Sequence, residues 1–300
     1  MKSSYILGIV LSLVWGGCGS WQDDHEWSQG VWSEDASEVA FVLNRFESKA
    51  NVWSFGGVKR QRNHQLQVHT APARRGATPE PLGPVFDGRL LNPNYLYYMQ
   101  DAGYALLSWY EEVTYRDESG SQIVRYHIDR IGLDGSHRSV ATREGVLMLS
   151  CDGGSSSTRV PEAVVATPSP DGSLLALVDA SPTCSGWTSQ VRFVRSSDLR
   201  PHSGPFTLPR RTEISGRAQL AWTPDGDFRV GYWGFGGVNG SQVSLSGIIT
   251  PFTGLAHECF YPATSSDFGN AAGQGIEVQD GGLSIEEGIW SESSALGCPD

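Results

Sequence analysis

A short unit, in which an acidic tight turn precedes an apolar run, recurs along the chain. Its clearest copy is TPSPDGSLLALVD at residues 167–179, where Pro170 and the following Asp-Gly pair favour a tight reversal of the backbone. The apolar residues from Leu174 to Val178 are typical of a buried strand. Aligned on its acidic residue, the unit recurs at Asp35, Asp101, Asp171, Asp225 and Asp280. The intervals of 66, 70, 54 and 55 residues suit a unit of four strands with loops.

A second marker, a glutamine that opens a strand-like stretch, follows four of the acidic turns. The four residues are Gln65, Gln122, Gln190 and Gln242. After the second of them, Asp134-Gly135 predicts a hairpin between two further strands. Each unit is therefore predicted to run strand, acidic turn, strand, loop, glutamine strand, turn, strand. The acidic residue and the glutamine are 30, 21, 19 and 17 residues apart, which predicts that the loop between the second and third strands varies most.

Composition supports an all-β chain with one large core. The 300 residues are 39% hydrophobic and include ten Trp, ten Tyr and 36 Gly, which is typical of many short strands joined by turns. We therefore expect one domain and a monomer. The formal net charge of −11 argues against nucleic acid as a partner, because a phosphate backbone binds basic surfaces.

The SPDG turn followed by an apolar strand, together with the later DGS hairpin, resembles the β-propeller repeats of TolB and related bacterial proteins. The motif is most complete at Asp171 and Asp225. The resemblance implies a propeller over residues 31–300 with four-stranded blades. Such blades pack around an axis because a lone sheet of this size cannot bury both of its faces.

Five acidic turns predict five blades, although the last unit has no glutamine strand and residues 45–93 have room for a sixth. A strand near residues 20–30 could complete the last blade. We expect the acidic residues to be structural and to accept hydrogen bonds from turn amides. The alternative is the sialidase Asp-box, S-x-D-x-G, but residues 169–173 lack its second glycine.

The N-terminus is typical of a targeting segment. Lys2 precedes an apolar run over residues 5–15, which is too short to span a bilayer. The small residues before Cys18 resemble the lipobox of bacterial lipoproteins, although Trp15 replaces the usual aliphatic residue. The resemblance implies a signal peptide at 1–17, a lipid on Cys18 that anchors the protein to an outer membrane or cell surface, and a linker or closing strand at 18–30. The alternative is ordinary cleavage with Cys18 retained.

The remaining cysteines are even in number, which in an exported protein favours disulfides. With Cys18 set aside they are Cys151, Cys184, Cys259 and Cys298. In the propeller that the resemblance implies, Cys151 and Cys184 lie in the loops before and after the unit of Asp171, and Cys259 and Cys298 lie in the equivalent loops around Asp280. The resemblance therefore implies the bonds Cys151–Cys184 and Cys259–Cys298. The sequence has no CxxC motif and no zinc-ligand spacing of histidines, so we expect no metal site and no cofactor.

Two loops carry nearly the same hexapeptide, WSFGGV at residues 53–58 and WGFGGV at residues 233–238. Aromatic rings beside paired glycines could present flat surfaces to a peptide or a sugar, and basic residues follow the first copy. The candidate binding rim is Trp53, Phe55, Lys59, Arg60, Trp233 and Phe235. The simpler interpretation is a repeated packing turn with its aromatic rings beneath the loop.

Enzyme motifs such as GxSxG, a Walker loop and HExxH are absent. We therefore predict a non-catalytic binding or scaffold module that recognises an envelope protein or peptide. The alternative is a carbohydrate-active propeller enzyme with carboxylates in its central channel, for which Asp225, Asp227 and the pair His257-Glu258 are candidates. A structural surface protein without a specific ligand is a third hypothesis.

Overall fold

The computed structural model describes residues 20–28, 30–33, 35, 37–50, 59–90, 96–116, 122–146, 148–149, 158–159, 164–183, 186–209, 218–223, 225–234, 237–254, 276–279 and 282–285. All regular secondary structure in these ranges is β-strand, which confirms the all-β prediction. Within the same ranges no helix has the length and apolar character needed to cross a membrane.

Four antiparallel sheets, each with four strand positions, follow one another along the chain. In the first two sheets the first position is filled by two short strands that share one edge of the second strand. The first sheet contains β1 (Gln22–Trp27), β2 (Val31–Trp32), β3 (Glu38–Ala50), β4 (Lys59–Pro72) and β5 (Glu80–Asp87). The second contains β6 (Arg89–Leu90), β7 (Leu96–Met99), β8 (Tyr104–Arg116), β9 (Gln122–Gly132) and β10 (His137–Val146).

The third and fourth sheets are simple four-stranded meanders. The third contains β13 (Val164–Pro168), β14 (Leu174–Thr183), β15 (Gly186–Arg195) and β16 (Pro201–Thr207). The fourth contains β17 (Ala218–Trp222), β18 (Phe228–Gly234), β19 (Gly237–Val243) and β20 (Ile249–Gly254). Two small pairs complete the described strands: β11 (Met148–Leu149) with β12 (Thr158–Arg159), and β21 (Ile276–Gln279) with β22 (Gly282–Ile285).

The sequence repeat corresponds to these sheets. Asp35, Asp101, Asp171 and Asp225 each lie between the first and second strands of one sheet. The glutamine marker lies in the third strand of each sheet, but only Gln122 opens its strand, so the prediction of a strand start is wrong for the other three. The second strands also differ in length, from 13 residues in β3 to seven in β18. Part of the variation in the distance from the acidic residue to the glutamine therefore comes from strand length and not from the loop.

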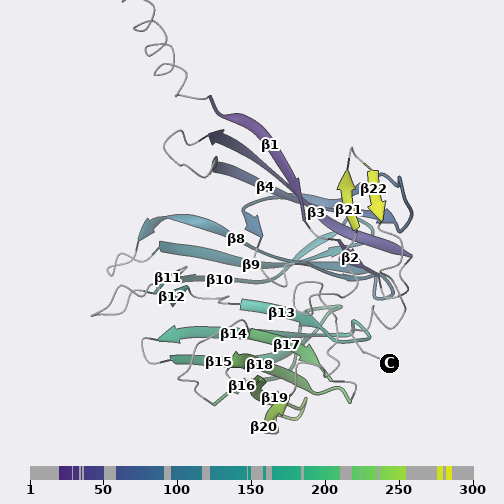
Figure 1. Ribbon diagram of the computed structural model, residues 1–300. Coiled ribbons are helices and arrows are strands. Elements are labelled where there is room, and N and C mark those ends of the chain that lie inside the picture. Colours follow the sequence, from purple (N-terminus) through teal and green to yellow (C-terminus); the bar gives the residue numbers. More distant parts are fainter. Residues whose placement is uncertain are drawn as a thin grey trace, which may run out of the picture.

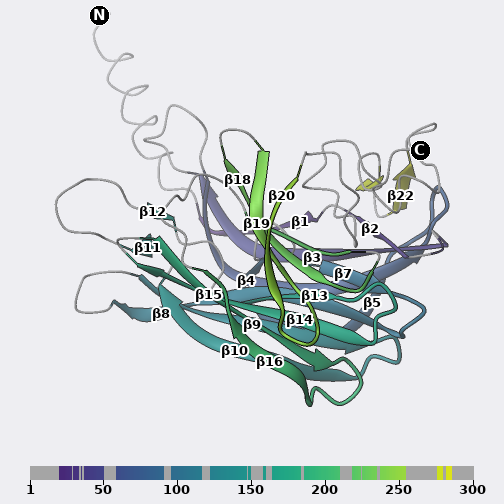
Figure 2. The same cartoon turned by 90° about the horizontal axis from the view of Figure 1, so that it is seen from below.

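Neighbouring sheets stack face to face in chain order (Figure 1). Clusters of buried apolar side chains join them, for example Val42 with Leu107, Leu106 with Leu175, Phe193 with Trp222, and Phe41 with Leu283. Because both faces of the inner sheets are covered, residues 104–109 of β8 are all buried and lack the apolar–polar alternation of a half-exposed strand. Seen from below, strands of the second and third sheets run alongside each other (Figure 2).

Polar contacts made by the first strands link successive sheets. The Tyr98 hydroxyl donates to the Glu38 carboxylate of the first sheet. The hydroxyl oxygens of Tyr97 and Thr167 are 3.4 Å apart, joining the second sheet to the third. Trp222 Nε1 donates to the Thr167 carbonyl over 3.2 Å, joining the fourth sheet to the third. The first strands therefore lie on the same side of the stack.

The C-terminal hairpin of β21 and β22 packs against the first sheet, far from it in sequence (Figure 1). Leu283 lies in a buried cluster with Val39 and Phe41. Its backbone bonds to the connection between β4 and β5, accepting from Gly76 N at 2.8 Å and donating to Ala77 O at 2.9 Å. The beginning and the end of the sheet succession thus meet.

Candidate binding site on the first sheet

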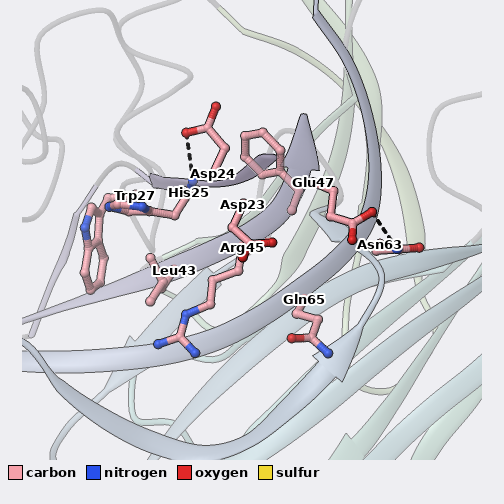
Figure 3. A pocket seen from close by; sticks show the side chains of 10 residues that line it. Asp23, Asp24, His25, Trp27, Leu43, Arg45, Glu47, Asn63 and Gln65 are labelled. Carbon is pink, nitrogen blue, oxygen red and sulfur yellow. Dashed lines mark hydrogen bonds between the residues drawn. The ribbon is translucent and has the colours of Figure 1, made fainter. Parts of the chain in front are cut away.

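An open hollow of about 660 Å³ lies on the first sheet, between side chains of β1, β3 and β4 (Figure 3). Strand pairing explains why these side chains share a face. Asp23, His25 and Trp27 of β1 lie directly opposite Glu47, Arg45 and Leu43 of β3. Residues opposite each other in an antiparallel pair point to the same side of the sheet.

Trp27 forms a fixed aromatic wall at one end of the hollow. Its ring meets the rings of Phe41 and His69 edge-on, with centroids 6.3 Å and 5.0 Å away and interplanar angles of 81°. Leu43 beside it is buried. The indole therefore offers a surface whose position costs little further ordering on binding.

The charged groups of the hollow fall into two sets. Glu47 is already bound, accepting from Arg62 Nε at 2.6 Å and from Asn63 Nδ2 at 3.0 Å. By contrast, the exposed side chains of Asp23 and Arg45 make no hydrogen bond or ion pair with any described residue. Among the described carboxylate and guanidinium groups that line the hollow, these two are therefore the ones without a partner in the described chain.

A buried polar group lies behind the hollow, on the opposite face of the sheet. His64 Nδ1 is 3.2 Å from Asn44 Oδ1, and its ring stacks on Phe46 at 5.3 Å. Burial, assisted by the positive charge of Arg89, lowers the pKa of His64 to about 4. The imidazole is therefore neutral at pH 7, and no described group cancels a positive charge there.

Of the predicted rim residues, the structure describes Lys59, Arg60 and Trp233, each at one end of its sheet. Lys59 and Arg60 begin β4, opposite Ala50 and Lys49, and the Arg60 side chain is exposed. Trp233 belongs to β18 and pairs with Val238, so the described residues of the second hexapeptide lie at the paired ends of β18 and β19. Several predicted residues lie outside the described part of the chain: Cys18, Trp53, Phe55, Cys151, Cys184, Phe235, His257, Glu258, Cys259, Asp280 and Cys298.

The acidic turns do not all use their carboxylates alike. Asp171 Oδ1 accepts from Ser169 Oγ at 2.6 Å and from Ser173 N at 3.0 Å. Asp35 repeats this pattern with Ser33 and Ser37, each at 2.9 Å. In both turns the carboxylate is occupied by the turn itself.

The turns at Asp101 and Asp225 differ from these, and the turn at Asp225 is one residue shorter than that at Asp171. Gly103 N donates to Gln100 O in the first, and Thr223 Oγ1 accepts from Asp227 N in the second. Asp225 makes no hydrogen bond with a described residue, whereas Asp227 Oδ2 accepts from Gln242 Nε2 at 2.6 Å. The structure therefore does not bring Asp225 and Asp227 together as a pair of free carboxylates.

Asp129 is the one fully buried carboxylate among the described residues. It accepts from Trp109 Nε1 at 2.6 Å, and its other oxygen lies 2.8 Å from His137 Nε2. These bonds tie β8, β9 and β10 together. The described residues include no group of His, Cys, Asp or Glu arranged to hold a metal ion.

The hollow is not predicted from the sequence, because residues 18–30 are expected there to form a linker or a strand of the last blade. β1 instead pairs with β3 in the first sheet. The polar run QDDHEW, with Trp27 as its only large apolar residue, is a weak signal for an edge strand. Nothing in it shows that Arg45 would be its neighbour.

Comparisons with known proteins give no family. No protein-family model matches the chain, and no curated protein matches it. Among solved structures, a candidate gluconolactonase is 12% identical, with 80% of this chain and 84% of that chain covered and a TM-score of 0.26. An endo-arabinase from Bacteroides thetaiotaomicron is also 12% identical, with 73% and 90% covered and a TM-score of 0.20. Likenesses this low carry no argument about function.

Proposed function

We propose that the protein is a lipid-anchored β-propeller of the bacterial cell envelope that binds another envelope protein or a peptide without catalysis. The supporting observation is the succession of similar sheets whose first strands contact one another, with the C-terminal hairpin against the first sheet. A ring needs its ends to meet in this way, whereas an open stack does not. Four sheets plus the hairpin correspond to five blades.

The binding surface belongs, in this proposal, to the end of the sheets that carries the connections between second and third strands. There the hairpins project from a rigid scaffold, which is where recognition loops usually lie. The opposite end carries the acidic turns and the connections between third and fourth strands, such as residues 244–248.

Site-specific photo-crosslinking in the native cell tests this proposal. A photoreactive phenylalanine at position 55 or 235 should give a crosslink to the same envelope protein. The matched control is position 248, because Ile248 is 65% exposed and lies at the opposite end of the fourth sheet. Adducts from position 248 alone, or from all three positions equally, would contradict a binding surface at the proposed end.

The lipid anchor has its own test. Cells fed labelled palmitate should label the wild-type protein, and Cys18→Ser should abolish the label and release the protein from membranes. An unlabelled, fully soluble wild-type protein would refute the anchor.

A carbohydrate-active enzyme is the second candidate, because Asp23 and Glu47 lie directly opposite each other in the same hollow as Trp27. Paired carboxylates beside an aromatic ring suit glycoside cleavage. Glu47 is already bound by Arg62 and Asn63, which places this candidate second. Release of reducing sugar from envelope polysaccharides, lost in Asp23→Asn, would support it over the binding module.

A further inference from the structure

The outer edge of β1 carries backbone groups that no described strand uses. β1 is the terminal strand of the first sheet, and among the described strands only β3 pairs with it. Just after β1, Ser28 N donates to Val42 O of β3 at 2.8 Å. Because the direction alternates along a strand, the even-numbered residues of β1 also direct their backbone N–H and C=O groups toward β3. His25 N instead donates to the Asp24 carboxylate at 3.0 Å, beside its own strand (Figure 3).

These two bonds fix the direction of the remaining backbone groups of β1. In an antiparallel pair, alternate residues direct both N–H and C=O to the partner strand or away from it. Asp23, His25 and Trp27 therefore direct their N–H and C=O groups away from β3, along the free edge. Their side chains stand on the face that holds the hollow.

The negative charge of this edge favours a positively charged partner. Asp23, Asp24 and Glu26 give β1 three carboxylates in six residues, in a chain of net charge −11. Asp23 is exposed and makes no hydrogen bond or ion pair with a described residue. An edge of this composition repels acidic strands and a second copy of itself, and it attracts basic ones.

We propose that β1 is a docking edge for an extended basic peptide, which adds to the first sheet as a further strand and places its side chains over the hollow. This inference rests on the proposed binding function and names its ligand class. Backbone hydrogen bonds to Asp23, His25 and Trp27 supply the pairing, as in other cases of strand addition. A carbonyl of the peptide takes the place of the Asp24 carboxylate on His25 N–H.

The hollow adds side-chain specificity. Asp23 and Trp27 are four residues apart on one face of β1, so a docked strand meets them with residues that are also four apart. A lysine or arginine pairs with the exposed Asp23 carboxylate, and an aliphatic residue packs on the fixed Trp27 ring. Peptides with this spacing should bind more tightly than peptides of the same composition in another order.

The test uses the purified full-length chain and a synthetic nine-residue peptide with a lysine at each end, a valine in the middle and threonine between. This symmetrical probe presents the required spacing in either strand direction. Calorimetric titration should detect binding that weakens as salt is added. The same peptide N-methylated at alternate residues, and an analogue with glutamate for lysine, should each bind at least about tenfold more weakly.

One pair of variants separates backbone pairing from side-chain contact. His25→Pro removes an N–H that faces away from β3, which an edge strand tolerates. It should weaken peptide binding at least about tenfold, whereas His25→Ala keeps the N–H and should bind within about twofold of wild type. Asp23→Asn should lower the affinity and flatten its salt dependence.

Equal binding by the proline and alanine variants, or equal binding of the N-methylated peptide, would overturn the proposal. The N-methylated peptide needs no variant chain, so it decides the question even if His25→Pro folds poorly. Failure of the probe to bind wild-type protein also overturns the docking edge. The crosslinks from positions 55 and 235 would remain, so the proposed function can survive that outcome.

Discussion

Two acidic residues that look alike in the sequence differ in what their carboxylates do. Asp171 lies in SPDGS and Asp225 in TPDGD. In the first turn a backbone hydrogen bond runs from Ser169 N to Leu174 O. In the second the corresponding bond runs from Thr223 N to Asp227 O, so this turn is one residue shorter. The shorter turn places no described donor on Asp225, so only Asp171 satisfies polar groups of its own turn.

Replacing these two residues should therefore have different costs. Asp171→Ala leaves Ser169 Oγ and Ser173 N without their acceptor and should lower the free energy of unfolding by about 1 kcal/mol. Asp225→Ala, the matched control, should change it by less than about 0.5 kcal/mol. Urea denaturation of both variants measures the difference. Equal costs would mean that the carboxylate bonds contribute nothing.

The same turn should respond to acid. Burial acts to raise the pKa of Asp171, but hydrogen bonds from Ser169 and Ser173 outweigh it, and the net pKa is lowered from its ordinary 3.8. A lowered folded-state pKa stabilises the fold above the unfolded value, and this contribution is lost as the pH falls through the folded one. Asp171→Ala should thus cost less at pH 2 than at pH 7.

His64 gives a second pH dependence, in a milder range. Its pKa is about 4 when folded and 6.5 when unfolded, so the unfolded chain takes up the proton first. The contribution of His64 is complete above pH 6.5 and should fall by about 1–3 kcal/mol as the pH drops toward 4. His64→Gln should flatten the unfolding free energy measured between pH 7 and 4.5. An unchanged slope would show that His64 is not desolvated.

At the scale of elements, the acidic turns also join neighbouring sheets. Tyr104 of the second sheet donates its hydroxyl to the Gly172 carbonyl over 3.1 Å, and Ser196 Oγ donates to the same oxygen over 2.6 Å. Gly172 has a φ of +66°, and a Cβ there would collide with the Ala102 Cβ. Gly226, at the equivalent turn position, has a φ of +85°, and no atom of a described residue lies within 4 Å of such a Cβ.

Alanine at these two glycines separates backbone strain from packing between sheets. Gly226→Ala should cost about 1 kcal/mol from its positive φ alone. Gly172→Ala adds the collision with the second sheet and should cost about 2–4 kcal/mol. Thermal unfolding of both variants is the measurement. If both cost the same, the turn at Asp171 does not depend on contact with the second sheet.

The strands themselves were largely predictable, because apolar runs such as residues 174–178 and turn residues such as Asp134-Gly135 act locally. The turn at Asp134 lies between β9 and β10 as expected, with Ser136 N donating to Asp134 Oδ1 at 3.0 Å. The candidate site was not predictable. Its groups come from strands 20 to 40 residues apart in sequence, and only their register puts Arg45 opposite His25 and Gln65.

At the scale of the whole molecule, the predicted disulfides would close two loops across successive strands. Their cysteines lie outside the described residues, so the pairing Cys151–Cys184 and Cys259–Cys298 stays a prediction. Peptide mapping without reduction should recover these two pairs, and each Cys pair replaced by serine should cost about 2–5 kcal/mol in unfolding experiments. A peptide linking Cys151 to Cys298 would refute both the pairing and the blade arrangement behind it.

The sequence alone determined the all-β class, the turn positions and the order of strands within each sheet, because these depend on local backbone preferences and on apolar patterning. Tertiary structure decided which segments become neighbours: that β1 joins the first sheet, that the C-terminal hairpin packs beside β3, and that Asp23 and Arg45 share a hollow. Strand register and sheet packing are long-range choices, and a one-residue shift would move every side chain of β1 to the other face.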